Sequence, residues 1–285
     1  MPEASLSVLP ARLIDGDISL ELPPDAVDKF RPDAKVLSPG AKVFLPHLEG
    51  KPPEQQVAAA KALIDMGYTP VVHLGARHFA TEADFVRHLE AHSANGVTHA
   101  LFLGGNPARY SGPFGQALDL LHHPSLHDSG IRRAFLGGYP EGHPDISEDR
   151  LDAALSAKID RCHDIGLAPE VVTQFAFDGE VLAGFAWRMQ ARHPDVPVRL
   201  GLAGVTSLPK LIRYAIMCGV GPSLSVLKKS SGKLLGVLAD KDPSDVANVI
   251  EQRITDHDGR VELHFFPFGG WQKTLDWLQR YRETP

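Results

Sequence analysis

Acids, histidines and amides follow the short apolar runs of this chain, and these side chains can transfer protons or form directed hydrogen bonds. A carboxyl or imidazole group can act as a general acid or base, and a side-chain amide offers both a donor and an acceptor. Stability alone requires few polar groups at such positions, so we interpret them as a candidate site. The residues that close the runs are Glu21, His47, Glu49, His73, Gly104, Gly105, Asn106, Tyr139, Glu141, His143, Gln174, residues 204–207 and residues 267–270.

Eight short runs rich in apolar and β-branched residues predict the strands that must position these groups. The runs are near-continuous, which is typical of strands that are buried on both faces of a parallel sheet. We expect strands at residues 18–22, 42–46, 70–74, 98–103, 133–136, 170–175, 198–202 and 261–266.

Helix-length segments with alternating polar and apolar character separate these strands. The clearest are residues 54–66, 82–92, 148–165, 180–191 and 209–218, and we expect extra helices between residues 219 and 258, before the eighth strand. The alternation predicts an α/β fold, a single (β/α)8 TIM barrel formed by residues 1–285. Active sites in such barrels lie at the carboxyl ends of the strands, so we expect the polar strand-end residues to converge there.

The composition excludes several classes of protein. Hydrophobic residues make up 43% of the chain, which is enough for a sizeable core, and the net charge of −6 with no basic run disfavours nucleic-acid binding. No apolar stretch approaches the roughly 18 residues of a membrane span, and residues 1–17 do not resemble a signal peptide. Cys162 and Cys218 form no CxxC pair, so a reducing cytoplasmic location fits best.

Searches for common catalytic motifs fail. Residues 218–221 begin like a dinucleotide-binding loop, and residues 231–234 resemble part of a phosphate-binding loop, but both lack required positions. The chain holds no HExxH and no GxSxG motif. His122 and His123 lie in a segment that we expect to be a solvated loop, so we predict no metal site.

Four strand-end motifs resemble those of the methylenetetrahydrofolate reductase family, in the right order and with sensible spacing. They are GYPEGHP at residues 138–144, TQFAFD at 173–178, SLELPP at 19–24 and VHL at 72–74. The resemblance spans residues 18 to about 281. It implies an FAD-dependent oxidoreductase that interconverts 5,10-methylenetetrahydrofolate and 5-methyltetrahydrofolate, with NADH or NADPH as the electron donor.

The resemblance also implies roles for individual residues. Glu21 corresponds to the acid that protonates the substrate near N10, and burial at an apolar strand end would raise its pKa for that task. Gln174 corresponds to a glutamine that contacts the pterin, and Tyr139 and His143 correspond to flavin contacts. The alternatives are an ordinary carboxylate at the barrel mouth, an amide that bonds a neighbouring loop, and a structural turn.

Three further residues are weaker candidates for binding the cofactor. His73 is as consistent with a core histidine as with a cofactor contact. Asp152 follows His143 at the family's spacing, whereas Lys158 is one residue off it, and either residue is also consistent with an exposed position on a helix.

Departures from the family pattern cluster at the fourth strand. The family's LRGD is replaced here by Leu103-Gly104-Gly105-Asn106, so the arginine and aspartate positions hold Gly104 and Asn106. An amide still forms hydrogen bonds but carries no charge, and we expect a retuned flavin potential or weaker retention of FAD. Leu208 replaces the family's aromatic residue near the folate, and Phe268 occupies a loop that lacks the expected basic residue for the folate tail.

Three functional hypotheses remain open from the sequence. The first is the FAD-dependent oxidoreductase of folate one-carbon metabolism and methionine biosynthesis. The second is a flavin-independent reductase on the same barrel that still uses Glu21 and takes hydride directly from NAD(P)H. The third is a non-catalytic barrel that binds a pterin or flavin. Under each, the partner is a small molecule, no nucleic acid or membrane is involved, and a homo-oligomer is allowed.

Overall fold

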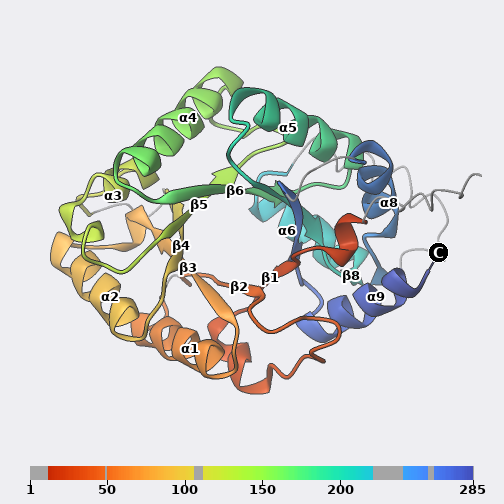
Figure 1. The fold of residues 1–285 in the computed structure, drawn as a ribbon, viewed down its shortest axis with the longest axis horizontal. Coiled ribbons are helices and arrows are strands. Elements are labelled where there is room, and N and C mark those ends of the chain that lie inside the picture. The colour runs from red at the N-terminus through yellow and green to blue at the C-terminus, as the bar shows by residue number, and fades with distance from the viewer. Residues whose placement is uncertain (1–11, 49, 106–111, 221–239, 256–259, 285) are drawn as a thin grey trace, which may run out of the picture.

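Eight parallel strands close into a barrel in the computed structural model, which describes residues 12–48, 50–105, 112–220, 240–255 and 260–284 (Figure 1). The order around the barrel is β1-β10-β7-β6-β5-β4-β3-β2, in which each strand pairs in parallel with its neighbours. All eight predicted strands and the predicted barrel are confirmed. The strands are β1 Ser19–Glu21, β2 Lys42–Leu45, β3 Thr69–Gly75, β4 His99–Leu103, β5 Arg133–Gly138, β6 Ala168–Phe175, β7 Val198–Ala203 and β10 Val261–Phe266.

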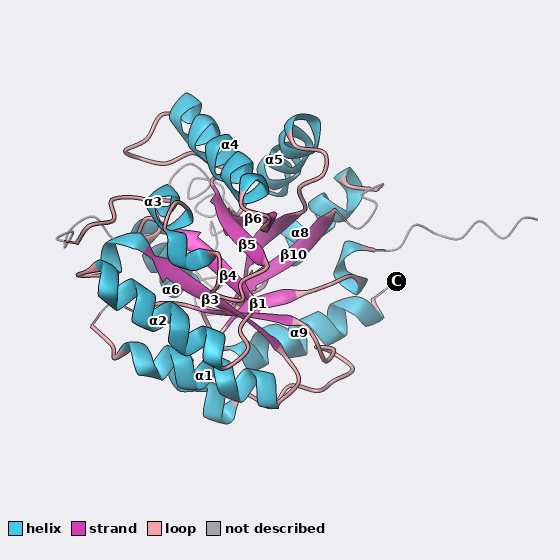
Figure 2. Ribbon diagram, turned by 60° about the vertical axis from the view of Figure 1, so that its left-hand side comes forward, coloured by secondary structure: helices cyan, strands magenta, loops and turns pink. Residues whose placement is uncertain are grey.

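Helices surround the strands on the outside, as Figure 2 shows. The five predicted helices are present within two residues of their expected ends, and α8 confirms an extra helix before the last barrel strand. The short α3 was not predicted, because five residues are too few to show helical periodicity. The helices are α1 Pro53–Asp65, α2 Glu82–Ala94, α3 Ala117–Leu121, α4 Glu148–Asp164, α5 Gly179–Arg192, α6 Leu208–Met217, α8 Ser244–Arg253 and α9 Trp271–Glu283.

A short antiparallel pair joins β8 Thr206–Ser207, directly before α6, to β9 Asp240–Lys241, shortly before α8. Residues 221–239, for which further helices were expected, lie outside the described residues. None of the described helices is long and apolar enough to cross a membrane.

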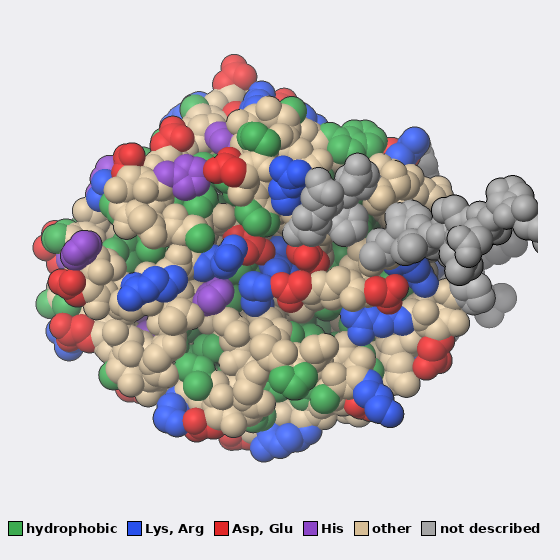
Figure 3. Space-filling view, in the orientation of Figure 1, with side chains coloured by type: hydrophobic (Ala, Val, Ile, Leu, Met, Phe, Trp, Pro, Cys, Tyr) green, Lys and Arg blue, Asp and Glu red, His purple; other side chains and the backbone are tan. Residues whose placement is uncertain are grey.

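The lumen of the barrel is filled in layers, because every second side chain of a strand faces inward. The layer at the amino ends of the strands is charged and is held by ion pairs, among them Arg199 with Asp17 (2.6 Å) and Arg133 with Glu170 (2.8 Å). Figure 3 shows charged side chains gathered at the centre of one face. The members of this layer are Asp17, Lys42, His99, Arg133, Glu170, Arg199 and Glu262.

An apolar layer lies above the charged one and separates it from the carboxyl ends of the strands. Its aromatic rings pack edge to face, with the Phe44 and Phe135 centroids 4.9 Å apart. Ser19 and His264, which are adjacent across β1 and β10, are the polar side chains at this level. The apolar members are Phe44, Val71, Leu101, Phe135 and Val172. This layer forms the floor beneath the strand-end residues.

Candidate active site at the carboxyl ends of the strands

A cavity of about 110 Å³ opens at the top of the lumen, and Glu21 lies in its wall. Glu21 is the last residue of β1, and its side chain is 25% exposed. Burial raises the pKa of Glu21 to about 7. The other lining residues are His73, Leu101, Leu103, Gly137, Gly138, Tyr139, Val172, Thr173, Gln174, His264 and Phe266. The structure thus brings the predicted residues Glu21, His73, Tyr139 and Gln174 together.

His73 lies beside Glu21, with its Nε2 atom 3.7 Å from Oε1 of the acid. The imidazole is 6% exposed, and burial lowers the pKa of His73 to about 3, with smaller contributions from His47 and His78. Gln56 donates a hydrogen bond from its amide to the backbone carbonyl of His73 (3.2 Å) and so fixes the strand here. His73 is therefore neutral at neutral pH, and it adds no positive charge that would draw the proton from Glu21.

An irregularity in β6 positions Gln174. The pairing register with β7 shifts between Val172 and Phe175, and the Gln174 side chain accepts a hydrogen bond from the backbone N–H of Phe175 (3.1 Å). Gly201 on β7 makes the shift possible, because a Cβ there would lie 2.6 Å from the Thr173 carbonyl oxygen. Gln174 then lines the same cavity as Glu21, from a strand three places away around the closed barrel.

Tyr139 lies in the walls of both the lumen cavity and a second, larger groove. The groove measures about 530 Å³ and is lined by residues of α4 and α5 together with residues 139–142. The ring of His143 meets the Tyr139 ring edge to face at 5.5 Å, and Nδ1 of His143 accepts a hydrogen bond from the N–H of Asp145 (3.1 Å). The loop after β5 is thus both a rigid turn and a site wall.

Asp152 and Lys158 lie on different faces of α4, Asp152 near its start and Lys158 further along the helix. Asp152 lines the groove and forms an ion pair with Arg192 of α5. Lys158 lines neither space, and it interacts with Cys162 one turn further along α4. Burial lowers the pKa of Lys158 to about 8. The structure therefore places Asp152 beside Tyr139 but does not bring Lys158 to either site.

The two residues after β4, Gly104 and Gly105, carry no side chain, but the guanidinium group of Arg77 reaches them from the segment after β3. Arg77 donates a hydrogen bond from Nη1 to the carbonyl of Gly105 (2.9 Å), and a Cβ on Gly104 would lie 3.1 Å from the same nitrogen. Gly105 has a φ of +79°, which favours glycine. The positive charge of Arg77 also acts on the Tyr139 hydroxyl, whose pKa burial raises. Asn106 lies outside the described residues.

Helix α6 packs against the loop after β10 and the end of β6 through aromatic contacts. The Phe268 ring stacks on Tyr214 of α6 with centroids 4.1 Å apart, and it meets Phe175 at 4.9 Å. Leu208, the first residue of α6, is 5% exposed. The end of the helix is close enough to the acid that the Glu21 charge adds to burial in raising the pKa of Cys218, to about 11. Leu208 and Phe268 thus belong to this packing.

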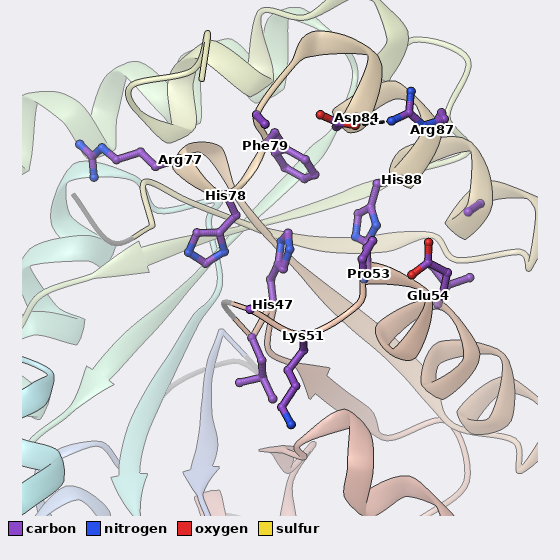
Figure 4. A pocket seen from close by; sticks show the side chains of 15 residues that line it. His47, Lys51, Pro53, Glu54, Arg77, His78, Phe79, Asp84, Arg87 and His88 are labelled. Atoms are coloured by element: carbon purple, nitrogen blue, oxygen red, sulfur yellow. Dashed lines mark hydrogen bonds and ion pairs between the residues drawn. The ribbon is translucent and has the colours of Figure 1, made fainter. Parts of the chain in front are cut away.

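A histidine-rich cleft of about 520 Å³ lies outside the barrel, between the loops that lead into α1 and α2 (Figure 4). The rings of His47 and His88 stack at 5.3 Å, and Nε2 of His88 lies 2.8 Å from the Gln56 side-chain oxygen. Burial lowers the pKa of His47 to about 3 and that of His88 to about 4, so both are neutral. Within the described residues, no group of three or more His, Cys, Asp or Glu side chains is arranged to hold a metal ion.

Two residues at the mouth received no role from the sequence. His264 lies in the strand VELHFF, where the alternation of inward and outward side chains places it in the lumen together with Glu262 and Phe266. Arg77 lies in a short 3-10 helix, and its proximity to Gly104 and Gly105 depends on the pairing of β3 with β4. The alternation in β10 is a signal that identifies His264, whereas nothing local in the sequence identifies Arg77.

Comparison with known sequences decides the family. The sequence model described as methylenetetrahydrofolate reductase matches residues 50–231, which is more than half of the chain. The chain belongs to the methylenetetrahydrofolate reductase family. The resemblance to this family is thereby confirmed. Three of the four strand-end motifs, at residues 72–74, 138–144 and 173–178, lie within the matched segment, whereas SLELPP at residues 19–24 lies outside it.

Two known proteins resemble the chain to different extents. It is 28% identical over 143 residues to methylenetetrahydrofolate reductase (NADH) 1 of Arabidopsis thaliana, a match that covers 46% of this chain and 24% of the plant protein. The match thus spans about a quarter of that relative's length. A solved Clostridium thermocellum protein that binds two copies of 5-methyl-5,6,7,8-tetrahydrofolic acid has a TM-score of 0.58 and 10% identity, with coverage of 95% of this chain and 96% of that one. At this identity the likeness shows the fold.

Proposed function

We propose that this protein is an oxidoreductase that interconverts 5,10-methylenetetrahydrofolate and 5-methyltetrahydrofolate, with Glu21 as the general acid and NADH as the electron source. One observation carries the proposal: Glu21 lies in the mouth of the barrel with a pKa raised to about 7. Family membership, the plant relative's name and the folate-binding structural neighbour support the substrate and the donor.

The acid has a defined task in this reaction. The five-membered ring of the substrate opens when the bond between N10 and the methylene carbon breaks, and N10 then takes a proton while the carbon stays on N5 as an iminium. Glu21 holds a proton at neutral pH and supplies it to N10. A hydride added to the iminium carbon completes the 5-methyl product. Gln174 offers an amide that can pair with the edge of the pterin.

Substrate binding requires the mouth to open. The Glu21 cavity measures about 110 Å³, whereas sites for ligands of this size are typically about 300–1,000 Å³. Tyr139 lies in the walls of both this cavity and the groove beside α4 and α5, and the end of α6 lies near Glu21. We therefore propose that Tyr139 and the end of α6 move when the folate binds.

The residues at the ends of β4 and β5 fit a flavin. Gly104 and Gly105 let side chains of the segment after β3 approach the backbone closely. Among them, Arg77 would bring a positive charge to the edge of a flavin, and Tyr139 and His143 would contact it. A bound FAD would accept hydride from NADH and pass it to the folate. The same glycines also favour the second candidate, direct transfer from NADH, because β4 ends without the charged side chains of the family motif.

The absorption spectrum of the purified protein, together with NADH oxidation in the presence of 5,10-methylenetetrahydrofolate, tests these proposals. The visible bands of an oxidised flavin and turnover that rises with added FAD support the flavin. A colourless protein that oxidises NADH only when the folate is present supports direct transfer. Arg77→Gln should weaken FAD binding, while Arg87→Gln, which alters an exposed residue paired with Asp84, serves as its control. A protein that binds folate but never oxidises NADH would refute the proposed activity.

A further inference from the structure

His264 is a fully buried histidine in the wall of the catalytic cavity. It occupies the middle of β10, and its ring lies 4.5 Å from that of Phe44 and 4.8 Å from that of Phe266. Its exposed fraction is 0%, yet it lines the same cavity as Glu21. The proposed chemistry assigns it no part.

Hydrogen bonds from below determine which ring nitrogen of His264 carries the hydrogen. Nδ1 lies 3.0 Å from the Ser19 hydroxyl oxygen, to which Arg199 donates a hydrogen bond from Nη1 (3.2 Å). The hydrogen of the Ser19 hydroxyl must point away from Arg199. Of the two acceptors within reach, Nδ1 of His264 at 3.0 Å is nearer than the Leu263 carbonyl oxygen at 3.4 Å. Burial, assisted by the charge of Arg199, lowers the pKa of His264 well below its ordinary value. On this basis we assign the hydrogen of the neutral ring to Nε2.

The Nε2 atom of His264 has no hydrogen-bond partner among the described residues, and the same holds for Nε2 of His73. Both nitrogens belong to residues that line the Glu21 cavity. Its volume of about 110 Å³ is that of about four water molecules in the liquid, at about 30 Å³ each. A space of this size with several polar groups in its wall is a typical site for ordered water.

We propose that His264 is a positioning residue, which donates a hydrogen bond from Nε2 to an ordered water that in turn donates to the Glu21 carboxylate. Arg199 and Ser19 orient the donor from beneath, and the neutral His73 closes the cavity beside it. A donor to the charged form of an acid stabilises that form, so this water limits the rise in pKa that burial causes. Burial and the water thus act on the pKa of Glu21 in opposite directions, and a general acid works best when its pKa lies near the operating pH. This consequence for catalysis rests on the proposed function, whereas the water contact does not.

The pKa of Glu21 in the substrate-free protein tests the proposal directly. It is read from the carboxyl carbon resonance of protein labelled with ¹³C-glutamate, with Glu21→Gln to assign the signal. His264→Phe keeps a flat ring but removes the donor, and we expect it to raise the pKa of Glu21 by about one unit. His264→Gln retains an N–H donor and should restore the pKa to within a few tenths of a unit. An unchanged pKa in a folded His264→Phe protein would overturn the proposal.

A second measurement is made on the wild-type protein, and a variant is needed only to assign the signal. In protein labelled with ¹⁵N-histidine, we expect the His264 nitrogens to show the pattern of a neutral ring protonated at Nε2, assigned by its loss in His264→Gln. A ring protonated at Nδ1 or at both nitrogens would contradict the proposal. Neither measurement uses substrate, so these outcomes are distinguishable from a failure to reduce the folate, which would count against the proposed activity alone.

Discussion

Nε2 of His73 lies 3.7 Å from Oε1 of Glu21, and the imidazole is neutral because burial lowers its pKa to about 3. A protonated histidine at this distance would stabilise the carboxylate and lower the pKa of Glu21. The neutral ring does not, so the effect of burial on Glu21 prevails and the acid keeps a pKa of about 7. Burial, and not a charge on His73, therefore sets the protonation of this acid.

Replacing His73 should therefore leave the pH dependence of catalysis that Glu21 causes unchanged. His73→Gln removes a neutral ring, so the apparent pKa in the pH profile of kcat should stay within about half a unit of the wild-type value. The measurement is the rate of NADH oxidation with the folate substrate from pH 5 to pH 9. A rise of one unit or more would show that His73 carries a positive charge in the native protein.

The raised pKa of Glu21 also makes a prediction about stability. Its folded pKa of about 7 exceeds the ordinary value of 4.5, so its contribution to stability is fully present below about pH 4.5 and is lost as the pH rises through 7. Glu21→Gln cannot ionise, and at pH 8.5 we expect it to be more stable than the wild type by up to about 3 kcal/mol. Urea unfolding at pH 5 and pH 8.5 measures this difference. Equal stability differences at both pH values would mean that Glu21 ionises freely.

The barrel was predictable from the sequence because it depends on local patterns. Eight runs such as the one in β10 alternate with helix-length segments, and each run is apolar enough to be identified on its own. The candidate site was predictable only in part. Glu21 and Gln174 end strands and stand in motifs, whereas Arg77 reaches Gly104 through the pairing of neighbouring strands, which no local pattern encodes. The packing of α4 likewise decides that Asp152 faces the groove and Lys158 does not, and no local pattern in the sequence shows this.

Gly201 should be required for the geometry of Gln174. A Cβ on Gly201 would lie 2.6 Å from the Thr173 carbonyl oxygen and 2.8 Å from the Phe266 ring, both of which belong to the cavity wall. We expect Gly201→Ala to cost about 1–3 kcal/mol of stability and to raise KM for the folate as Gln174 is displaced. The matched control is Gly184→Ala in α5, where the nearest atom, of the Arg188 side chain, would lie 3.6 Å away. That change should leave KM unaltered and stabilise the helix by roughly 0.5–1 kcal/mol.

The charged layer at the amino ends of the strands should contribute to stability and not to catalysis. Glu170 and Arg199 are each 2% exposed, and Glu170 also pairs with Arg133. Glu170→Gln removes one member of a buried network, which typically costs about 3–5 kcal/mol. Asp65→Asn breaks the exposed pair of Asp65 with Lys61 and should change stability by less than about 1 kcal/mol. Thermal and urea unfolding of both variants compare the two, and a similar small loss in each would refute the role of the buried network.

The activity of Glu21→Gln tests the central claim most directly. The variant keeps the shape of the side chain but has no acidic proton, and Glu21→Asp keeps the proton on a shorter side chain. With 5,10-methylenetetrahydrofolate and NADH, we expect kcat to fall by at least about 100-fold in Glu21→Gln and less in Glu21→Asp. The wild-type rate should also decline as the pH rises above about 7. A Glu21→Gln protein that reduces the folate at the wild-type rate would contradict the account.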